Sequence, residues 1–141
     1  MIHVINDISD PLLNLIKDDP VRKDIYAIER VINNKEVMVL LDNNEPAAVV
    51  CVSYQDHIPK NERDLISSSD PTIAIFYTIW SYAAGAGRDL IEEAQAHIKE
   101  TKQGITNFVT LSPKTETAKR FHMRNGASVY RENEDTVNYK Y

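Results

Sequence analysis

The stretch that decides the fold of this chain runs from Ile73 to Arg88 and reads Ile-Ala-Ile-Phe-Tyr-Thr-Ile-Trp-Ser-Tyr-Ala-Ala-Gly-Ala-Gly-Arg. Its first eight residues are β-branched or aromatic apart from one alanine, which is typical of a buried strand. Residues 88–101 then place Leu90, Ile91, Ala94 and Ile98 on one helical face, with charged residues elsewhere. The pattern predicts a central strand followed by an amphipathic helix.

A Gly85-Ala86-Gly87 turn joins this strand to this helix. Such a turn leaves backbone N–H groups free at the positive end of the helix dipole, where a phosphate binds well. It is not a dinucleotide fingerprint, because Leu90 occupies the place of a third glycine, and no Gly-Lys-Ser/Thr of a Walker A loop follows. A plain flexible turn is the alternative. Two of only four glycines crowd into this helix start, which favours phosphate binding.

Composition predicts a single domain over residues 1–141. With 43% hydrophobic and 26% charged residues it resembles an ordinary globular protein, and its net charge of −5 favours neither a nucleic-acid nor a membrane partner. The sequence has no apolar run of about 18 residues and no signal-peptide pattern, and Cys51 is its single cysteine. We therefore expect a cytoplasmic protein with Cys51 in the core, and no metal site.

The rest of the chain supplies further strands and helices around this unit. Strands are expected at 2–5, 36–41, 47–54, 105–111, 127–131 and 136–141, and 36–54 reads as a hairpin. Helices are expected after Asp10-Pro11, over 21–32, over 88–101, and after Ser112-Pro113, with Ser112 as the N-cap. Val21, Ile25, Ile28 and Ile32 form the most regular helical stripe. Residues 55–72 form a long loop that we expect to cover the ligand site.

This order of elements predicts an α/β (α+β) domain with a mixed central sheet of about six to seven strands and four flanking helices. The strand–helix–strand unit at 73–111 should be a right-handed crossover between parallel strands. Gly85 then lies at the carboxyl end of a strand, where open α/β sheets bind ligands.

The pattern resembles the GNAT acyltransferases over almost the whole chain. In that family a Gln/Arg-x-x-Gly-x-Gly/Ala turn after the fourth strand binds the pyrophosphate of acyl-CoA, and the matching residues here are Tyr82 to Gly87. Tyr82 replaces the usual Gln or Arg, and Arg88 can compensate. The resemblance implies a site for acetyl-CoA or coenzyme A formed by the following residues: Ile79, Trp80, Ser81, Tyr82, Ala83, Gly85, Ala86, Gly87 and Arg88.

A second segment, Thr115 to Ala127, resembles the family pattern Asn-x-x-Ala-x-x-Phe-Tyr-x-x-x-Gly-Phe. Ala118, Phe121 and Gly126 fit this pattern. His122 stands where the family has a tyrosine that commonly protonates the departing CoA thiolate. The resemblance therefore implies that His122 acts on the sulfur side of the reaction, and a structural histidine hydrogen-bonded to the sheet is the alternative.

A narrower likeness joins residues 108–113, Phe-Val-Thr-Leu-Ser-Pro, to the Thr-Leu-Ser-Pro strand end of malonyl-CoA decarboxylases, which share the GNAT fold. In a decarboxylase no acceptor amine is required. Ser112 and His122 would hold the malonyl carboxylate, or the enolate that forms when CO2 leaves.

The GNAT resemblance implies an N-acetyltransferase that moves an acetyl group from acetyl-CoA to an amine of a small molecule or peptide, as a monomer or homodimer. Backbone N–H groups near Ile79 to Ser81 would polarise the thioester carbonyl, and His122 would donate a proton as an imidazolium. The candidates for the general base are His57 and Glu62. Trp80 is the candidate for lining the acyl pocket. The ribose phosphate of CoA is expected to contact Lys119, Arg120 and Arg124. Decarboxylation and a catalytically silent binding domain remain the alternatives.

Overall fold

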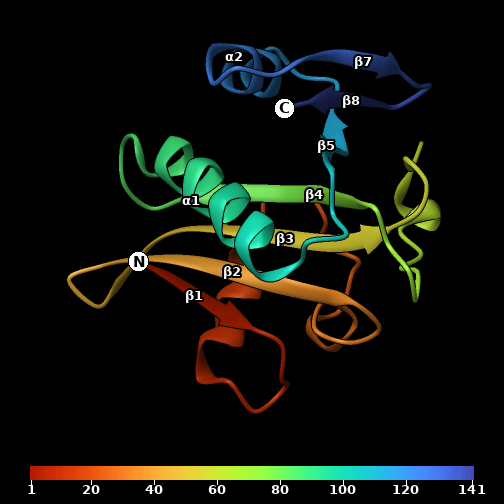
Figure 1. Ribbon diagram of the computed structural model, residues 1–141. Helices are drawn as coiled ribbons and strands as arrows, with labels where there is room; N and C mark the ends of the chain where they lie inside the picture. Colours follow the sequence, from red (N-terminus) through yellow and green to blue (C-terminus); the bar gives the residue numbers. More distant parts are fainter.

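A computed structural model describes all residues 1–141 and contains one mixed sheet with short and long helices around it (Figure 1). The elements in chain order are β1 (Ile2–Ile5), η1 (Pro11–Asp18), η2 (Ala27–Arg30), β2 (Lys35–Asp42), β3 (Glu45–Gln55), η3 (Glu62–Asp64), β4 (Ile73–Ser81), α1 (Ala86–Thr101), β5 (Asn107–Thr110), β6 (Ser112–Pro113), α2 (Glu116–Arg124), β7 (Ser128–Glu132) and β8 (Thr136–Lys140). The three η elements are 3-10 helices.

The eight strands form a sheet in the order β1-β2-β3-β4-β5-β8-β6, with β7 paired to β8. Only β4 and β5 are parallel, and the remaining pairs are antiparallel. The predicted hairpin, the parallel pair around α1 and the final strand pair are all present. The mixed α/β class expected from the sequence is therefore confirmed.

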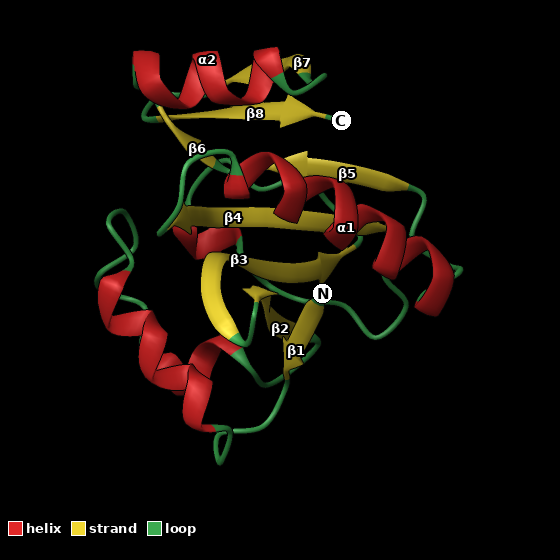
Figure 2. Ribbon diagram, turned by 90° about the vertical axis from the view of Figure 1, so that its left-hand side faces the viewer, coloured by secondary structure: helices red, strands yellow, loops and turns green.

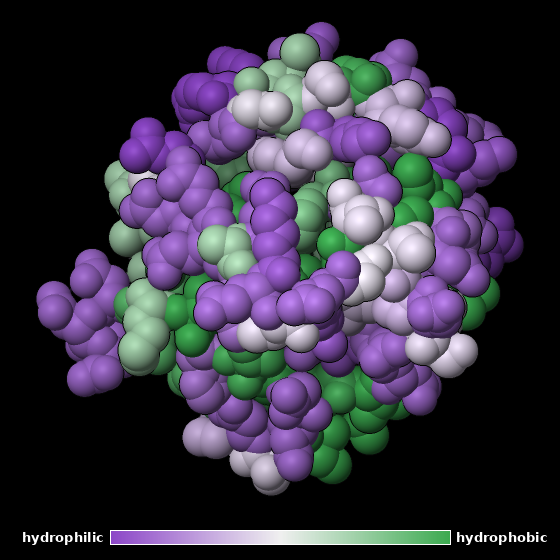
Figure 3. Space-filling view, in the orientation of Figure 1, coloured by the Kyte–Doolittle hydropathy of each residue, from purple (hydrophilic) through white to green (hydrophobic).

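The sheet is covered on both faces (Figure 2). α1 buries Leu90, Ile91, Ala94 and Ile98 on one face against residues of β2, β3 and β4. η1 and the segment after it cover the other face, where Leu13 and Ile16 pack on the sheet. Hydrophilic side chains cover most of the face seen in Figure 3, with hydrophobic patches between them. None of the helices combines the length and the hydrophobicity that a membrane-spanning segment requires.

The helix predicted over residues 21–32 does not form, so this prediction is wrong. Only η2 forms there, so the domain has two α-helices and three 3-10 helices instead of four flanking helices. Val21, Ile28 and Ile32 are 36%, 49% and 41% exposed, whereas Arg22 and Arg30 are buried. Of the predicted stripe only Ile25 packs against the core, and the buried side chains of Arg22 and Arg30 help to attach the segment to the sheet.

The prediction that Ser112 caps the second helix is also wrong. Ser112 and Pro113 form β6, which pairs with Val137 and Thr136 of β8. Thr115 caps α2 instead, and its side chain accepts a hydrogen bond from the N–H of Ala118. Ser112 therefore has no capping role to explain its presence.

A bulge in β4 and the end of β5 create a gap in the sheet. β3 pairs Cys51 with Thr78 and Val52 with Phe76, which leaves Tyr77 as an extra residue on β4. The β4–β5 ladder ends at Phe76 and Thr110, followed by one bond from Leu111 N–H to Phe76 O of 3.0 Å. Beyond that point the chain leaves β4 to form β6.

The long loop at 55–72 lies on the face opposite α1. Ile58 and Leu65 pack in the core of that face. The carbonyl oxygens of Pro59 and Lys60 accept hydrogen bonds from Asn138 and Thr136 of β8. These contacts tie the start of the loop to the C-terminal strand.

Candidate active site in the gap between β4 and β6

A cavity of about 310 Å³ occupies the gap where β4 diverges from the end of β5. β4 forms one wall, and the chain from Leu111 to Pro113 with α2 forms the other. The lining residues are Pro20, Val21, Phe76, Tyr77, Thr78, Ile79, Trp80, Ser81, Gly87, Leu111, Ser112, Pro113, Thr115, Thr117, Ala118, Phe121 and His122. None of these is an aspartate or a glutamate.

Ser112 and His122 form the only pair of reactive side chains in this cavity. The Ser112 Oγ lies 3.1 Å from the His122 Nε2, and the Ser112 hydroxyl donates to Thr110 Oγ1 at 2.7 Å. The N–H of Tyr139 donates to the same Thr110 oxygen at 3.0 Å. A continuous chain of hydrogen bonds thus runs from β8 through Thr110 and Ser112 to the imidazole.

His122 is a neutral imidazole at neutral pH. The residue is only 4% exposed, and burial lowers its pKa to about 4. No carboxylate contacts the ring, whose neighbours are Phe121, Tyr139 and Tyr141. The expectation that His122 donates a proton as an imidazolium is therefore wrong, because desolvation removes the charged form.

Tyr141 orients this imidazole from its other side. The Tyr141 hydroxyl lies 2.6 Å from His122 Nδ1. Burial raises the pKa of Tyr141 well above its ordinary value, so the phenol keeps its hydrogen. The arrangement that uses this hydrogen has the phenol donating to Nδ1, which places the ring hydrogen on Nε2, toward Ser112 and the cavity.

The backbone of β4 presents hydrogen-bond donors to the same cavity. Tyr82 N–H donates to Ala47 O on β3 at 2.7 Å. Hydrogen-bonded positions alternate along an antiparallel pair, and Ser81 and Ile79 fall between them in this register. Their N–H groups consequently face away from β3, toward the gap, as expected for a site that polarises a carbonyl.

The Gly-Ala-Gly turn has the geometry of an anion site. Gly85 has φ +78°, a left-handed conformation, and serves as the N-cap of α1 without any side chain. The N–H groups of Gly87 and Arg88 make no backbone hydrogen bond. Gly87 has a second role in packing, because a Cβ there would lie 2.9 Å from Cε1 of Phe121.

The other residues of the predicted cofactor segment lie around the cavity in different ways. Ile79, Trp80 and Ser81 line it, as does Gly87, while Ala83, Gly85 and Arg88 are exposed at the turn and Ala86 is buried in α1. Tyr82 is 44% exposed; its hydroxyl accepts from Trp80 Nε1 at 3.0 Å and donates to Asp18 at 2.7 Å. Tyr82 is thus tied to η1 instead of to the turn.

Neither candidate base lines the cavity, so the structure does not support either of them. His57 contacts Asp56 at 3.0 Å in the loop, a contact that raises the pKa of His57. Glu62 pairs with Arg22 at 3.2 Å on the face opposite α1. Lys119, Arg120 and Arg124 are exposed on α2, where a ribose phosphate could meet them.

Sequence reasoning found Ser112 and His122 and missed their partners. Thr110 lies in the quoted segment 108–113, and Tyr141 follows the alternating residues of the last strand, but nothing in either pattern indicates a contact with His122. Pro20, Val21 and Thr78 were also missed. They reach the cavity only because η1 and the bulge of β4 place them there.

Several solved structures share this architecture. Malonyl-CoA decarboxylase from Cupriavidus metallidurans superposes with a TM-score of 0.79 at 17% identity, over 100% of this chain and 60% of that one. A putative GNAT-family acetyltransferase from Desulfovibrio desulfuricans gives 0.67 at 16% identity, over 100% and 97%. A Bacillus subtilis acetyltransferase in complex with CoA gives 0.67 at 13%, over 99% and 95%.

The chain therefore has the GNAT fold, as the resemblance in its sequence predicted. It spans 36%, 60% and 33% of the length of the three malonyl-CoA decarboxylases that it matches. No protein-family model matches this sequence, and no curated protein matches it either.

Proposed function

We propose that this protein removes CO2 from a malonyl-type acyl-CoA, using Ser112 and His122. The observation that carries the proposal is the 3.1 Å contact between Ser112 Oγ and His122 Nε2 in a cavity without any carboxylate. Thr110 and Tyr141 support the pair from either side. The structural likeness to malonyl-CoA decarboxylases agrees with this chemistry.

Decarboxylation needs donors for an oxyanion and no strong base. The bond between C2 and the carboxyl carbon breaks, CO2 leaves, and the electron pair of that bond moves into the thioester to give an enolate. C2 then takes one proton from a water molecule, which makes acetyl-CoA and leaves hydroxide to the solvent. The developing enolate oxygen is best stabilised by fixed donors in a dry site, a role that suits the N–H groups of Ile79 and Ser81. The Ser112 hydroxyl and the N–H of His122 Nε2 would join them by exchanging their present acceptors, Thr110 Oγ1 and Ser112 Oγ, for the enolate oxygen.

The Gly85–Arg88 turn is the part of the site that we assign to the CoA pyrophosphate. Two unpaired N–H groups and the positive end of α1 favour a phosphate there. The acyl-CoA would then extend from this turn into the cavity past Gly87, which belongs to the turn and also lines the cavity.

Transfer of an acetyl group from acetyl-CoA to an amine is the second candidate. The observation that favours it is the match to acetyltransferases over nearly their whole length. Amine transfer needs a base for the incoming ammonium, and no carboxylate or charged histidine lines this cavity. We therefore rank it below decarboxylation.

Incubation with malonyl-CoA tests the proposal. We expect acetyl-CoA and CO2 to appear together, with no free CoA, by chromatography and mass spectrometry. Release of CoA from acetyl-CoA in the presence of amines would instead support acetyl transfer. Calorimetric binding of CoA without turnover of either thioester would indicate a binding domain.

A further inference from the structure

Arg22 makes hydrogen bonds to residues that line two different hollows. The first is the cavity of about 310 Å³ at Ser112 and His122. The second is a groove of about 360 Å³ formed by η2, the start of β2 and the loop at 55–72. Tyr77 is the single residue that lines both, so the two hollows adjoin at this residue of β4.

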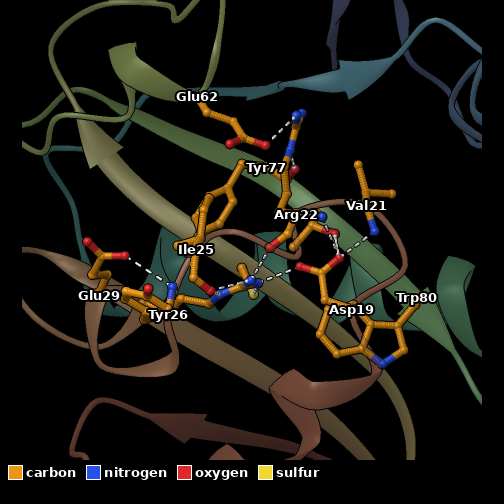
Figure 4. A network of polar contacts seen from close by, with 12 residues as sticks. Asp19, Val21, Arg22, Ile25, Tyr26, Glu29, Glu62, Tyr77 and Trp80 are labelled. Atoms are coloured by element: carbon orange, nitrogen blue, oxygen red, sulfur yellow. Dashed lines mark hydrogen bonds and ion pairs between the residues drawn. The ribbon is translucent and has the colours of Figure 1, made fainter.

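The side chain of Arg22 lies beside Tyr77 (Figure 4). Its Nε donates to Tyr77 O at 3.1 Å and its Nη2 donates to Leu111 O at 2.7 Å. These two carbonyl groups belong to the diverging chains on either side of the gap. Its Nη1 donates to Glu62 at 3.2 Å, on the groove side. One guanidinium thus bridges both edges of the gap and the wall of the groove.

Neighbouring charges hold Arg22 in this place. Asp19 accepts from the backbone N–H of Arg22 at 3.0 Å and binds the guanidinium of Arg30. Burial alone would raise the pKa of Asp19, but these hydrogen bonds outweigh it and the pKa lies below its ordinary value. Asp19 and Arg30 compensate each other, which leaves Glu62 as the counter-ion of Arg22.

We propose that Arg22 is a plug that sets the reaction specificity of the site by keeping acyl acceptors out. A nucleophile that approached the thioester through the sheet from the groove would have to pass where the guanidinium lies. With the passage closed, the enolate and the thioester meet neither an amine nor water from that side. The proposal rests on the proposed acyl-CoA site but not on decarboxylation itself.

Removal of the plug should permit a reaction that the wild type excludes. In Arg22→Ala the carbonyl groups of Tyr77 and Leu111 lose their donor, and water is expected to enter the space between the two hollows. Hydroxylamine can then attack the thioester of acetyl-CoA. A bond forms between its nitrogen and the acyl carbon, the C–S bond breaks, and the proton of the amine leaves with the CoA thiol.

The experiment measures free CoA released from acetyl-CoA with and without hydroxylamine, after subtraction of the protein-free rate. We expect Arg22→Ala to release CoA about 10-fold or more faster than the wild type, since water exclusion suppresses such side reactions. Arg22→Met, which fills the space without charge, should stay near the wild-type rate. Arg63→Ala removes another cation of the groove and serves as the matched control.

Equal rates of CoA release in the wild type and in Arg22→Ala, with acetyl-CoA binding and melting curves retained, would overturn the role proposed for Arg22. Equal acceleration in the Ala and Met variants would overturn it as well. If Arg22→Ala does not fold, Arg22→Gln, which keeps one donor but leaves space, carries the same expectation. Absence of malonyl-CoA decarboxylation in the wild type would overturn the proposed function alone, whereas loss of all acyl-CoA binding would overturn both.

Discussion

Ser112 Oγ and His122 Nε2 lie 3.1 Å apart because a two-residue strand, β6, pairs with β8 beneath α2. Val137 is the partner of Ser112 in that pair. Tyr139 of β8 contacts Thr110, and Tyr141, the residue that follows β8, contacts His122 Nδ1. The C-terminal strand therefore positions Ser112 and Thr110, while α2 carries His122 to them.

The first prediction concerns Ser112 and His122. Ser112→Ala and His122→Gln should each lower kcat for decarboxylation of malonyl-CoA by about 100-fold, the usual range for a group that acts only in the transition state. KM should change little, because the CoA turn is untouched. Steady-state kinetics by chromatography measures both values. Ser128→Ala, which removes an exposed hydroxyl on β7, should behave as the wild type. An unchanged kcat in both active-site variants would contradict the role.

The second prediction is a flat pH profile. Because burial lowers the pKa of His122 to about 4, the imidazole stays neutral between about pH 6 and pH 8. The kcat for decarboxylation should therefore show no titration in that range, whereas an imidazolium acid would lose activity as pH rises. Turnover measured in buffers of constant ionic strength checks this expectation. A decline with a midpoint near 6.5 would restore the imidazolium role.

Much of the fold could be predicted because its signals are local. The strand–turn–helix at 73–101, the hairpin and the last strand pair all follow from side-chain pattern and turn residues. The prediction of a helix at 21–32 was wrong for a physical reason. Its apolar residues recur at helical spacing, yet Asp19, Arg22 and Arg30 form a buried polar network that holds the segment in an irregular path.

The candidate site was only partly predictable, since its members meet through tertiary structure. Ser112 looked like a helix cap because proline follows it, and only the pairing with β8 shows otherwise. His122 was found from its place in a motif, but its charge state depends on burial of this α2 residue against Tyr139 and Tyr141. Arg22 was missed because a charged residue in a predicted amphipathic helix is expected to face solvent.

The third prediction concerns stability at low pH. His122 has a pKa of about 4 when folded and about 6.5 when unfolded, so the unfolded state binds more protons between these values. The free energy of unfolding should fall by about 3 kcal/mol as pH drops from 6.5 to 4. Urea titrations of wild type and His122→Gln check this. The variant should lose this part of the slope, and His97→Gln on α1 should keep it.

The fourth prediction separates the two roles of Gly87. A methyl group there would contact Phe121 at 2.9 Å, so Gly87→Ala should destabilise the fold by about 1–3 kcal/mol through overpacking. The double variant Gly87→Ala, Phe121→Leu should recover part of that loss, as measured by thermal unfolding. Gly85→Ala meets no neighbour but strains a positive φ. Recovery of stability without recovery of CoA affinity would show that the turn itself binds the phosphate.

The last prediction tests how the imidazole is oriented. Tyr141 and Tyr139 both contact His122, but only Tyr141 places its hydroxyl on the ring, at 2.6 Å from Nδ1, while Tyr139 stacks on the face of the ring. Tyr141→Phe removes the donor that keeps the hydrogen on Nε2, so the two tautomers become closer in energy and the donor toward the cavity is lost part of the time. Loss of one such hydrogen bond is worth about 1.4 kcal/mol, or roughly 10-fold in kcat.

Tyr139→Phe keeps the stacking and should leave kcat near that of the wild type. The ring nitrogens report the tautomer directly through their 15N chemical shifts, which should move in Tyr141→Phe and not in Tyr139→Phe. A fall in kcat of equal size in both variants, with unchanged shifts, would mean that the tyrosines act through packing alone.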